Sequence, residues 1–364
     1  MILILRAQIP PEELDQALVQ IGCIIGLPLP PLVKMEERYM LALDAAHVDE
    51  EAFKSLAGLP AIERVIPTKR PYKLVSRELK SEPTVVMVGD GITSNVTLIG
   101  GIEAPTIIAG PCAVESREQL FATALAVKKA GAHILRGGAF KPRTSPYQFQ
   151  GLGVEGLALL AEAREQTGLP IVTEVMEPDM VEVVAGYADM LQIGARNMQN
   201  YPLLTACGRQ QRPVMLKRGL SATVNEWLLA AEYIVAAGNP NVVLCERGIR
   251  SYDPQTRNVL DLTVVPLLRE LTHLPVIVDP SHATGKSTLV PAMARASIAV
   301  GGDGIMVEVH SHPEEALCDG QQAITPHQLS EIIRNIRAMV SLSFEEGKDV
   351  THGYDAIYPH FIVR

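Results

Sequence analysis

The sequence predicts an α/β protein whose largest part is a (β/α)₈ TIM barrel. From residue 106 onwards, short runs rich in Val, Ile and Leu alternate with amphipathic stretches of about ten residues or more. Eight such runs occur, and they begin at residues 106, 133, 170, 189, 213, 241, 275 and 304. Aromatic residues make up only 4% of the chain, as expected for buried parallel strands covered by helices of small and aliphatic residues. A doubly wound open sheet would have fewer strands and a glycine-rich first turn.

Residues 1–67 are predicted to form a separate, small ferredoxin-like α+β domain. One helix is expected to begin at Pro10-Pro11-Glu12 and to end at Gly22, and a second is expected at residues 50–56. Strands are expected at residues 2–5, 23–27, 39–43 and 62–66. The resulting order, β-α-β-β-α-β, is typical of the ferredoxin-like fold.

The remaining chain is predicted to contain a linker, the barrel and a C-terminal extension. Residues 68–105 are expected to form a linker and a hairpin that caps the barrel. The hairpin signal is two apolar runs, at residues 84–88 and 96–99, on either side of Gly89-Asp90-Gly91. The barrel is expected to cover residues 106–340. Residues 341–364 follow the last predicted helix, and the sequence indicates no role for them.

Composition and charge limit the classes of function. The 364 residues include 32 Lys and Arg against 41 Asp and Glu, which gives a net charge of −9. This balance argues against a general nucleic-acid or membrane-surface binder, because phosphate surfaces attract positive charge. No apolar run reaches the roughly 20 residues that span a bilayer, and the N-terminus lacks the pattern of a secretory signal. Five scattered cysteines without CxxC spacing favour a reducing cytoplasm.

A polar residue stands at or just after the end of each predicted barrel strand. These residues are Cys112, Arg136, Glu174, Arg196, Lys217, Arg247, His282 and Glu308. Lys141, Arg143 and Asp319 lie in the loops beyond them. Because TIM-barrel active sites form at the C-terminal ends of the strands, we expect these side chains to converge. A single charged side chain is usually a solvated surface group, but that explanation is poor for the whole set.

The converging residues fall into two chemical groups. The cations repel one another unless a small polyanion binds among them, such as a phosphate joined to a carboxylate; they are Arg136, Lys141, Arg196, Lys217 and Arg247. The second group comes from the first, seventh and eighth strands, which are adjacent in a closed barrel, and consists of Cys112, His282, Glu308 and Asp319. Thiolate, imidazole and carboxylate ligands suit a first-row divalent metal. His310 and His312 are rival ligands, because they lie close to Glu308 in the sequence.

Eight motifs surround these residues in the predicted barrel. They are GPCAVES (110–116), LRGGAFKPRTSPYQFQG (135–151), TEVMEP (173–178), QIGARNMQN (192–200), LKRG (216–219), CERGIR (245–250), DPSHATG (279–285) and VEVH (307–310). Together they resemble the 3-deoxy-D-arabino-heptulosonate 7-phosphate (DAHP) synthase family, and its type Iβ members in particular. The resemblance covers residues 106–340, and the N-terminal 67 residues with residues 71–80 resemble the ferredoxin-like extension of some members.

The resemblance implies condensation of phosphoenolpyruvate with erythrose 4-phosphate, with release of inorganic phosphate. It implies that the five cations hold phosphoenolpyruvate and that Arg143 and Thr144 hold the phosphate of the sugar. It also implies that Cys112, His282, Glu308 and Asp319 hold Mn²⁺, Zn²⁺, Fe²⁺ or Co²⁺. Lys141, Cys112 and His282 are the expected catalytic residues. We expect the neighbouring cations to lower the pKa of Lys141, so that it can donate a proton.

Two further expectations concern control of the enzyme. Cys318 stands where the family usually has a smaller hydroxyl residue, and its position beside Asp319 suggests that a disulfide with Cys112 could inactivate the enzyme under oxidation. The ferredoxin-like extension implies feedback inhibition by tyrosine or phenylalanine, usually within a homotetramer. A purely stabilising role for residues 1–67 competes with that regulatory interpretation.

Three other functions compete with this interpretation. The sister synthase that makes 3-deoxy-D-manno-octulosonate 8-phosphate from arabinose 5-phosphate shares the fold, but it typically has Lys-Ala-Asn-Arg where this chain has Lys141-Pro142-Arg143-Thr144. A non-catalytic binding protein on a decayed barrel would have lost a cation or a metal ligand. An aldolase with a Schiff-base lysine would use Lys217, although five surrounding cations fit phosphate binding better.

Overall fold

The computed structural model describes residues 1–35, 37–44, 48–101, 104–143 and 145–346. Within these ranges the barrel is complete and confirms the predicted fold class. Eight parallel strands close into a ring in which the last strand, β14, pairs with the first, β7. The strands are β7 (Thr106–Gly110), β8 (Ile134–Arg136), β9 (Ile171–Glu174), β10 (Met190–Ile193), β11 (Val214–Lys217), β12 (Val242–Glu246), β13 (Val276–Val278) and β14 (Gly304–Glu308).

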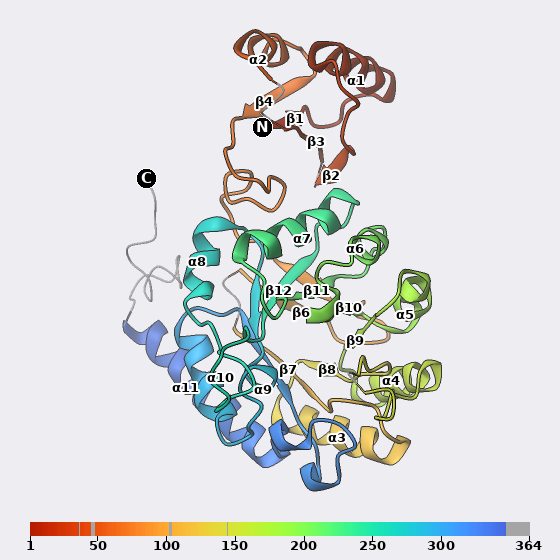
Figure 1. Ribbon diagram of the computed structural model, residues 1–364, viewed down its shortest axis with the longest axis vertical. Helices are drawn as coiled ribbons and strands as arrows, with labels where there is room; N and C mark the ends of the chain where they lie inside the picture. Colours follow the sequence, from red (N-terminus) through yellow and green to blue (C-terminus); the bar gives the residue numbers. More distant parts are fainter. Residues whose placement is uncertain (36, 45–47, 102–103, 144, 347–364) are drawn as a thin grey trace.

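Helices surround the barrel on the outside (Figure 1). They are α3 (Arg117–Ala130), α4 (Val154–Thr167), α5 (Val181–Tyr187), α6 (Tyr201–Gly208), α7 (Val224–Ala236), α8 (Val264–Leu271), α10 (Val290–Ala299) and α11 (Pro326–Glu346). Local sequence signals set several of their ends. The N-cap of α7 is a capping box of Thr223 and Glu226, and Gly131 ends α3 in the left-handed region with φ of +103°.

A two-stranded hairpin closes the end of the barrel opposite the strand C-termini. Its strands, β5 (Val86–Val88) and β6 (Thr97–Ile99), pair antiparallel. Val86, Val88 and Ile99 are fully buried in one apolar cluster with the inward-facing residues of the barrel strands, such as Ile108 and Met306. The hairpin therefore covers the apolar interior of the barrel at the N-terminal ends of the strands.

The N-terminal domain has the predicted β-α-β-β-α-β order, but its second strand lies elsewhere. The elements are β1 (Ile2–Leu5), α1 (Pro11–Ile25), β2 (Val33–Met35), β3 (Arg38–Ala42), α2 (Glu50–Ala57) and β4 (Ile62–Ile66), and the sheet order is β2-β3-β1-β4. Helix α1 continues through Gly22, and Gly26 ends it at φ +69°. The predicted strand at residues 23–27 is therefore wrong. A single glycine costs a helix only about 1 kcal/mol, and Ile24 and Ile25 pack into the core of the domain.

One face of the N-terminal sheet is buried against the linker. Ile2 and Ile4 belong to the same apolar cluster as Tyr72, Leu74 and Val75. The linker is in turn fixed to α7, where the carboxylate of Glu232 accepts hydrogen bonds from the backbone N–H groups of residues 73, 74 and 75 at 2.9, 2.8 and 3.0 Å. The domain thus sits beside the α7 side of the barrel, away from α3 and α4 (Figure 1).

At the C-terminal end, α11 passes residue 341 without a break and extends to Glu346. Residues 341–346 are therefore helical, and the rest of the predicted extension lies outside the described residues. No helix among the described residues is long and apolar enough to cross a membrane.

Candidate active site

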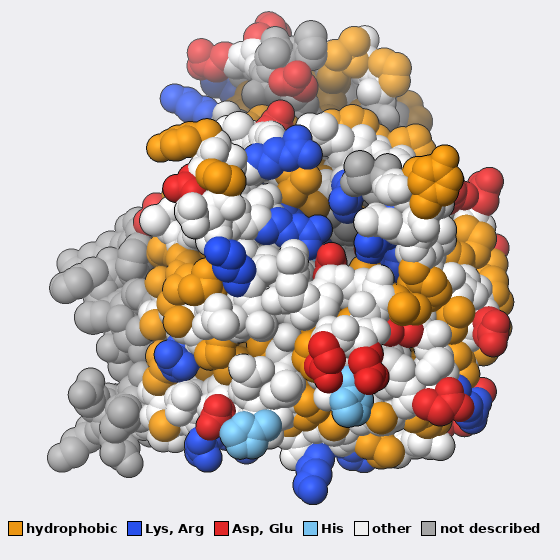
Figure 2. Space-filling view, turned by 60° about the horizontal axis from the view of Figure 1, so that its bottom comes forward, with side chains coloured by type: hydrophobic (Ala, Val, Ile, Leu, Met, Phe, Trp, Pro, Cys, Tyr) orange, Lys and Arg blue, Asp and Glu red, His pale blue; other side chains and the backbone are white. Residues whose placement is uncertain are grey.

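The strand C-termini surround a cavity of about 290 Å³ whose lining is rich in cations. Seven basic side chains line it: Arg136, Lys141, Arg143, Arg196, Lys217, Arg247 and Arg257. Figure 2 shows basic side chains gathered around this hollow on the face of the barrel. Every predicted cation is present, and Arg257 is an addition that the sequence analysis missed. Thr144 lies outside the described residues.

The alternation of side chains along the strands explains why these cations point inward. Lys217 ends β11 and lines the cavity, whereas the next residue, Arg218, faces outward. There the Arg218 guanidinium bonds Glu246 at 3.0 Å and Asp261 at 2.9 Å, both through Nη1. Glu246 ends β12, so the following residue, Arg247, reaches the cavity from the next strand. At the ends of β11 and β12, the inward side chains are therefore the cations Lys217 and Arg247. The outward side chains are Arg218 and Glu246, which bond to each other.

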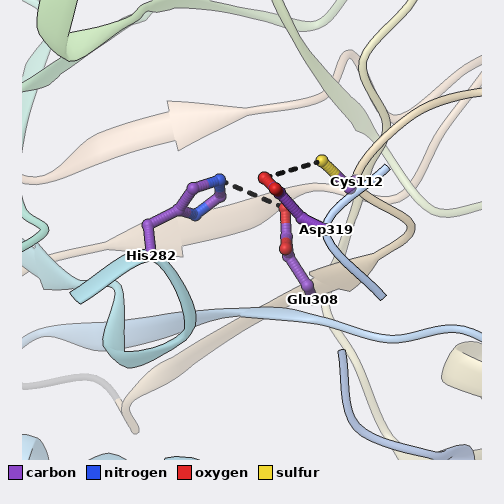
Figure 3. Close-up of side chains that lie close together, drawn as sticks. All are labelled: Cys112, His282, Glu308 and Asp319. Atoms are coloured by element: carbon purple, nitrogen blue, oxygen red, sulfur yellow. Dashed lines mark hydrogen bonds and ion pairs between the residues drawn. The ribbon is translucent and has the colours of Figure 1, made fainter. Parts of the chain in front are cut away.

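The four predicted metal ligands lie together at one side of this cavity. Ligand atoms of Cys112, His282, Glu308 and Asp319 all lie within 4.8 Å of one another. Figure 3 shows them converging from different segments, with His282 Nε2 3.1 Å from Glu308 Oε1 and Cys112 Sγ 3.6 Å from Asp319 Oδ2. One thiol, one imidazole and two carboxylates are a donor set that fits a first-row divalent metal.

The two rival histidines lie apart from this cluster. His310 is buried, and its Nε2 lies 3.6 Å from a carboxylate oxygen of Glu115. His312 is largely exposed and stands beside Glu314. Neither belongs to a group of potential ligands among the described residues.

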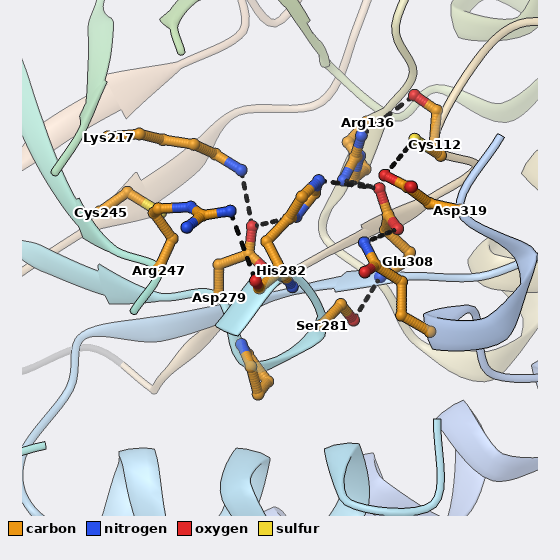
Figure 4. A network of polar contacts seen from close by, with 12 residues as sticks. Cys112, Arg136, Lys217, Cys245, Arg247, Asp279, Ser281, His282, Glu308 and Asp319 are labelled. Atoms are coloured by element: carbon orange, nitrogen blue, oxygen red, sulfur yellow. Dashed lines mark hydrogen bonds and ion pairs between the residues drawn. The ribbon is translucent and has the colours of Figure 1, made fainter. Parts of the chain in front are cut away.

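Asp279 orients His282, and the sequence analysis missed it. Its carboxylate accepts hydrogen bonds from His282 Nδ1 at 2.7 Å and from Lys217 Nζ at 2.6 Å (Figure 4). With Nδ1–H bound to Asp279, Nε2 faces the cluster, where a metal ion would take the place of its proton, and metal-binding histidines are commonly oriented in this way. Burial alone would raise the pKa of Asp279, but His282 and Lys217 hold it well below its usual range. Burial lowers the pKa of His282, and Asp279 and Glu308 raise it more, to about 9.

Glu308 is fully buried and fixed from several sides. Arg136 Nη1 donates to its Oε1 at 2.9 Å, and Gln322 Nε2 donates to its Oε2 at 2.6 Å. Its backbone N–H donates to Ser281 Oγ at 3.0 Å, as Figure 4 shows. Burial would raise the pKa of Glu308, but His282 and Arg136 lower it well below its usual range. A carboxylate that stays ionised in a buried site is available to a metal cation.

Cys112 and Cys318 lie side by side as free thiols. Their Sγ atoms are 3.1 Å apart, so the predicted proximity is confirmed, while the oxidation step stays a prediction. The hydrogen bond with Cys318 and burial raise the pKa of Cys112. The same hydrogen bond lowers the pKa of Cys318.

The expectation for the pKa of Lys141 is wrong in sign. Its Nζ donates to the backbone oxygen of Cys112 at 3.1 Å, and its side chain is buried. Burial and Arg136 do lower the pKa of Lys141, but Cys112, Cys318 and Glu174 raise it more, above its ordinary value. The two thiols and the carboxylate, which no sequence pattern places beside Lys141, outweigh its neighbouring cation.

The signals for the missed residues differ. Asp279 precedes a proline and stands three residues before His282, so it matches an N-cap pattern, and its side chain does accept from the His282 backbone N–H. Arg257 lies in the loop after β12, and Gln322 ends a short 3₁₀ helix, η5 (Gly320–Gln322). Arg257 Nη1 donates to Gln322 Oε1 at 2.9 Å and to Asp319 Oδ2 at 3.3 Å. No pattern in the sequence indicates either of those contacts.

Known proteins resemble this chain over most of its length. Residues 86–342 match the DAHP synthetase I family. The chain is 47% identical over 308 residues to phospho-2-dehydro-3-deoxyheptonate aldolase of Thermotoga maritima, which covers 84% of this chain and 88% of the relative. It is 35% identical over 250 residues to 2-dehydro-3-deoxyphosphooctonate aldolase of Bordetella petrii, over 62% of this chain and 87% of that protein.

Solved structures extend the similarity to the N-terminal domain. The crystal structure of phospho-2-dehydro-3-deoxyheptonate aldolase (DAHP synthase) from Thermotoga maritima superposes with a TM-score of 0.73 at 43% identity, over 94% of this chain and 97% of that chain. A truncated form of the DAHP synthase from the same organism gives a TM-score of 0.68 at 45% identity, over 74% of this chain and 97% of that one. From its sequence, its fold and the residues around its cavity, the chain belongs to the DAHP synthetase I family.

Proposed function

We propose that this protein is a DAHP synthase, which condenses phosphoenolpyruvate with erythrose 4-phosphate to give DAHP and inorganic phosphate, the first step of the shikimate pathway. The observation that carries the proposal is the cavity itself, where seven cations stand beside a thiol, imidazole and carboxylate cluster. A decayed barrel would have lost members of one set or the other. The 47% identity to a relative with the same activity in its name supports the choice.

Five of the cations fit phosphoenolpyruvate, which carries a phosphate and a carboxylate on the same carbon. They are Arg136, Lys141, Arg196, Lys217 and Arg247. Several of them are held by buried partners, such as Glu308 for Arg136 and Asp279 for Lys217. Fixed cations in a buried cavity bind a polyanion without reorganising, and they continue to stabilise its charge as the reaction proceeds. Phosphate stays bound while the carbon–oxygen bond to it breaks.

Arg143 is proposed to hold the phosphate of the aldehyde sugar, together with Thr144. Arg143 lines the cavity, and its Nε donates to Gln148 Oε1 at 3.0 Å, which leaves other guanidinium donors for a phosphate. Arg143 contacts Cys318 Sγ, so it stands next to the metal-ligand cluster. The aldehyde carbon would then lie between this phosphate site and the cluster. The Lys-Pro-Arg-Thr loop favours erythrose 4-phosphate over arabinose 5-phosphate.

The donor set fits a divalent metal, namely Mn²⁺, Zn²⁺, Fe²⁺ or Co²⁺. Cys112, His282, Glu308 and Asp319 would hold it, with His282 oriented through Asp279. When bound, such a metal supplies Lewis-acid polarisation of the aldehyde oxygen. Cys112 and His282 would contribute to catalysis by holding this metal.

The residues of the chain then serve each chemical step. The methylene carbon of phosphoenolpyruvate attacks the aldehyde carbon, and the aldehyde oxygen gains negative charge. Lys141 Nζ carries a proton in the buried cavity and can donate it to that oxygen. Positive character develops on the central carbon of phosphoenolpyruvate, where water adds. The resulting phosphohemiketal expels phosphate, whose charge the cations balance throughout.

A phosphate-release assay tests this function. Metal-loaded protein is supplied with phosphoenolpyruvate and either erythrose 4-phosphate or arabinose 5-phosphate. We expect phosphate release that depends on erythrose 4-phosphate. If neither aldehyde leads to phosphate release, the proposed activity is contradicted.

Residues 1–67 are further proposed to be a regulatory domain within a cytoplasmic homotetramer. Among the described residues, none of the cavity lining comes from this domain, and we therefore expect turnover to continue without it. Tyrosine or phenylalanine would bind a docked arrangement of these domains that covers the barrel mouth, which shifts the population towards a closed, inactive state. A chain that starts at Pro83 should keep turnover and lose inhibition by either amino acid. If the full-length enzyme ignores both at millimolar concentration, the domain only stabilises the assembly.

A further inference from the structure

Arg257 connects the two carboxylates of the ligand cluster. Its Nη1 donates directly to Asp319 Oδ2 at 3.3 Å and to Gln322 Oε1 at 2.9 Å. Gln322 Nε2 then donates to Glu308 Oε2 at 2.6 Å. One guanidinium nitrogen therefore reaches Asp319 directly and Glu308 through a single amide.

The direction of the Gln322 amide depends on Arg257. A glutamine amide has one acceptor end and one donor end. Because Arg257 donates to the amide oxygen, the amide NH₂ group faces the Glu308 carboxylate. In a reversed amide, the oxygen would face the Glu308 carboxylate and the NH₂ group would face the Arg257 guanidinium, and neither pair can form a hydrogen bond. Gln322 and Glu308 are both fully buried, so water does not replace a lost contact there. The pairing on Oε2 leaves Glu308 Oε1 turned towards His282.

The backbone of Arg257 is fixed to the segment that carries His282. The Arg257 N–H donates to Thr284 O at 3.0 Å, and the next N–H, of Asn258, donates to Ala283 O at 2.8 Å. Asn258 Nδ2 also donates to His282 O at 3.1 Å. Gly285 allows this close approach, because a Cβ at that position would lie 2.7 Å from Arg257 Cβ. The loop after β12 is thus held against the His282 segment, and its arginine reaches across to the segment that carries Asp319 and Gln322.

We propose that Arg257 is a positioning residue of the metal site, which holds Asp319 and, through Gln322, Glu308 in register with His282. The inference rests on the proposed function, in which these residues bind a divalent metal. Partners that orient metal ligands typically contribute a factor of about 10 to 100 to metal affinity.

Charge and positioning predict opposite effects of removing Arg257. A guanidinium beside a divalent cation repels it, so loss of the positive charge alone would tighten metal binding. Loss of the two hydrogen bonds frees the Asp319 carboxylate and the Gln322 amide, which weakens metal binding. The direction of the change in affinity therefore distinguishes the two roles.

The test compares Arg257→Met with Arg250→Met, which removes the same charge from an exposed position on the same loop that does not line the cavity. Metal-free proteins are titrated with Co²⁺ against a chromogenic chelator, and the visible spectrum of each Co²⁺ form is recorded. We expect Arg257→Met to bind Co²⁺ about 10- to 100-fold more weakly than wild type, with altered ligand-field bands. Arg250→Met should match wild type, and Arg257→Lys should bind with intermediate affinity.

The outcomes separate this inference from the proposed function. If wild type itself binds no Co²⁺, the proposed metal site is wrong. If wild type binds and Arg257→Met binds equally well or more tightly, the positioning role is overturned. If Arg257→Met does not fold, Gln322→Leu provides the test, because it does not alter the loop that carries Arg257. It should also bind Co²⁺ more weakly, and wild-type affinity in that variant would overturn the inference.

Discussion

Lys217 and Asp279 form a buried ion pair in which Nζ lies 2.6 Å from Oδ2. The pair joins the end of β11 to the start of the loop after β13, and the same carboxylate binds Nδ1 of His282. Asp279 therefore links the cation group of the cavity to the ligand group.

This ion pair argues against an aldolase that forms a Schiff base. A lysine that attacks a carbonyl must be a neutral amine, whereas Lys217 is paired with a carboxylate that its neighbours hold in the ionised form. We expect no change in protein mass when borohydride is added with phosphoenolpyruvate and erythrose 4-phosphate. An aldolase known to form a Schiff base serves as the positive control. A permanent mass increase on Lys217 would restore that alternative.

Metal removal should abolish turnover. We expect a chelator to stop the reaction and Mn²⁺, Zn²⁺, Fe²⁺ or Co²⁺ to restore it. Cys112→Ala and His282→Ala should lose bound metal and activity together, by more than the roughly 10- to 100-fold that loss of an outer partner costs. Metal content and rate are measured on the same samples. Full activity in chelator would mean that the Cys112, His282, Glu308 and Asp319 cluster has another role.

Arg143 and Arg196 should affect different substrates. Arg143→Ala removes a charged hydrogen-bond donor from the proposed sugar-phosphate site, which corresponds to about a 30-fold rise in the KM for erythrose 4-phosphate. Arg196→Ala should instead raise the KM for phosphoenolpyruvate. Steady-state kinetics with each substrate varied in turn provide the comparison. Equal effects of both variants on both substrates would show that the division of the cations is wrong.

His273 should make the stability of the protein depend on pH. It is buried between the linker and the hairpin, where Nε2–H donates to Leu74 O at 2.9 Å and Nδ1 accepts from Thr84 Oγ1 at 2.8 Å. Burial lowers its pKa from 6.5 to about 4. Between these values the unfolded chain binds the extra proton, so stability falls as pH falls through this window. At pH 5 the loss from this group is about 2 kcal/mol relative to pH 7.

Urea unfolding of wild type and His273→Gln at pH 7 and pH 5 measures this contribution. Glutamine can keep a donor and an acceptor at this position, but it does not titrate. Wild type should lose about 2 kcal/mol more than the variant on acidification. An equal loss in both proteins would assign the pH dependence to other groups.

The sequence predicted the barrel and most of the cavity because both follow from periodic patterns. Residues at strand ends such as Arg136 and Lys217 can be placed from strand boundaries alone, since the barrel brings all strand C-termini to one face. The end of α1 could not be placed in this way, because Gly22 and Gly26 are both plausible helix ends and tertiary packing selects the second.

Contacts between loops could not be predicted, because they depend on how separate segments pack. Arg257 and Gln322 are 65 positions apart, and they meet only after two loops pack against the same ligand segment. The direction of the pKa change at Lys141 was missed for the same reason. It depends on the distance to Cys318 and Glu174, which lie in other loops and strands.

A competition between the two aldehydes shows which sugar phosphate the enzyme condenses. Metal-loaded, full-length protein receives phosphoenolpyruvate with equal concentrations of erythrose 4-phosphate and arabinose 5-phosphate, and mass spectrometry identifies the sugar acid phosphate that forms. We expect the seven-carbon product, DAHP, in large excess. An excess of the eight-carbon product would contradict it and would identify the sister synthase instead.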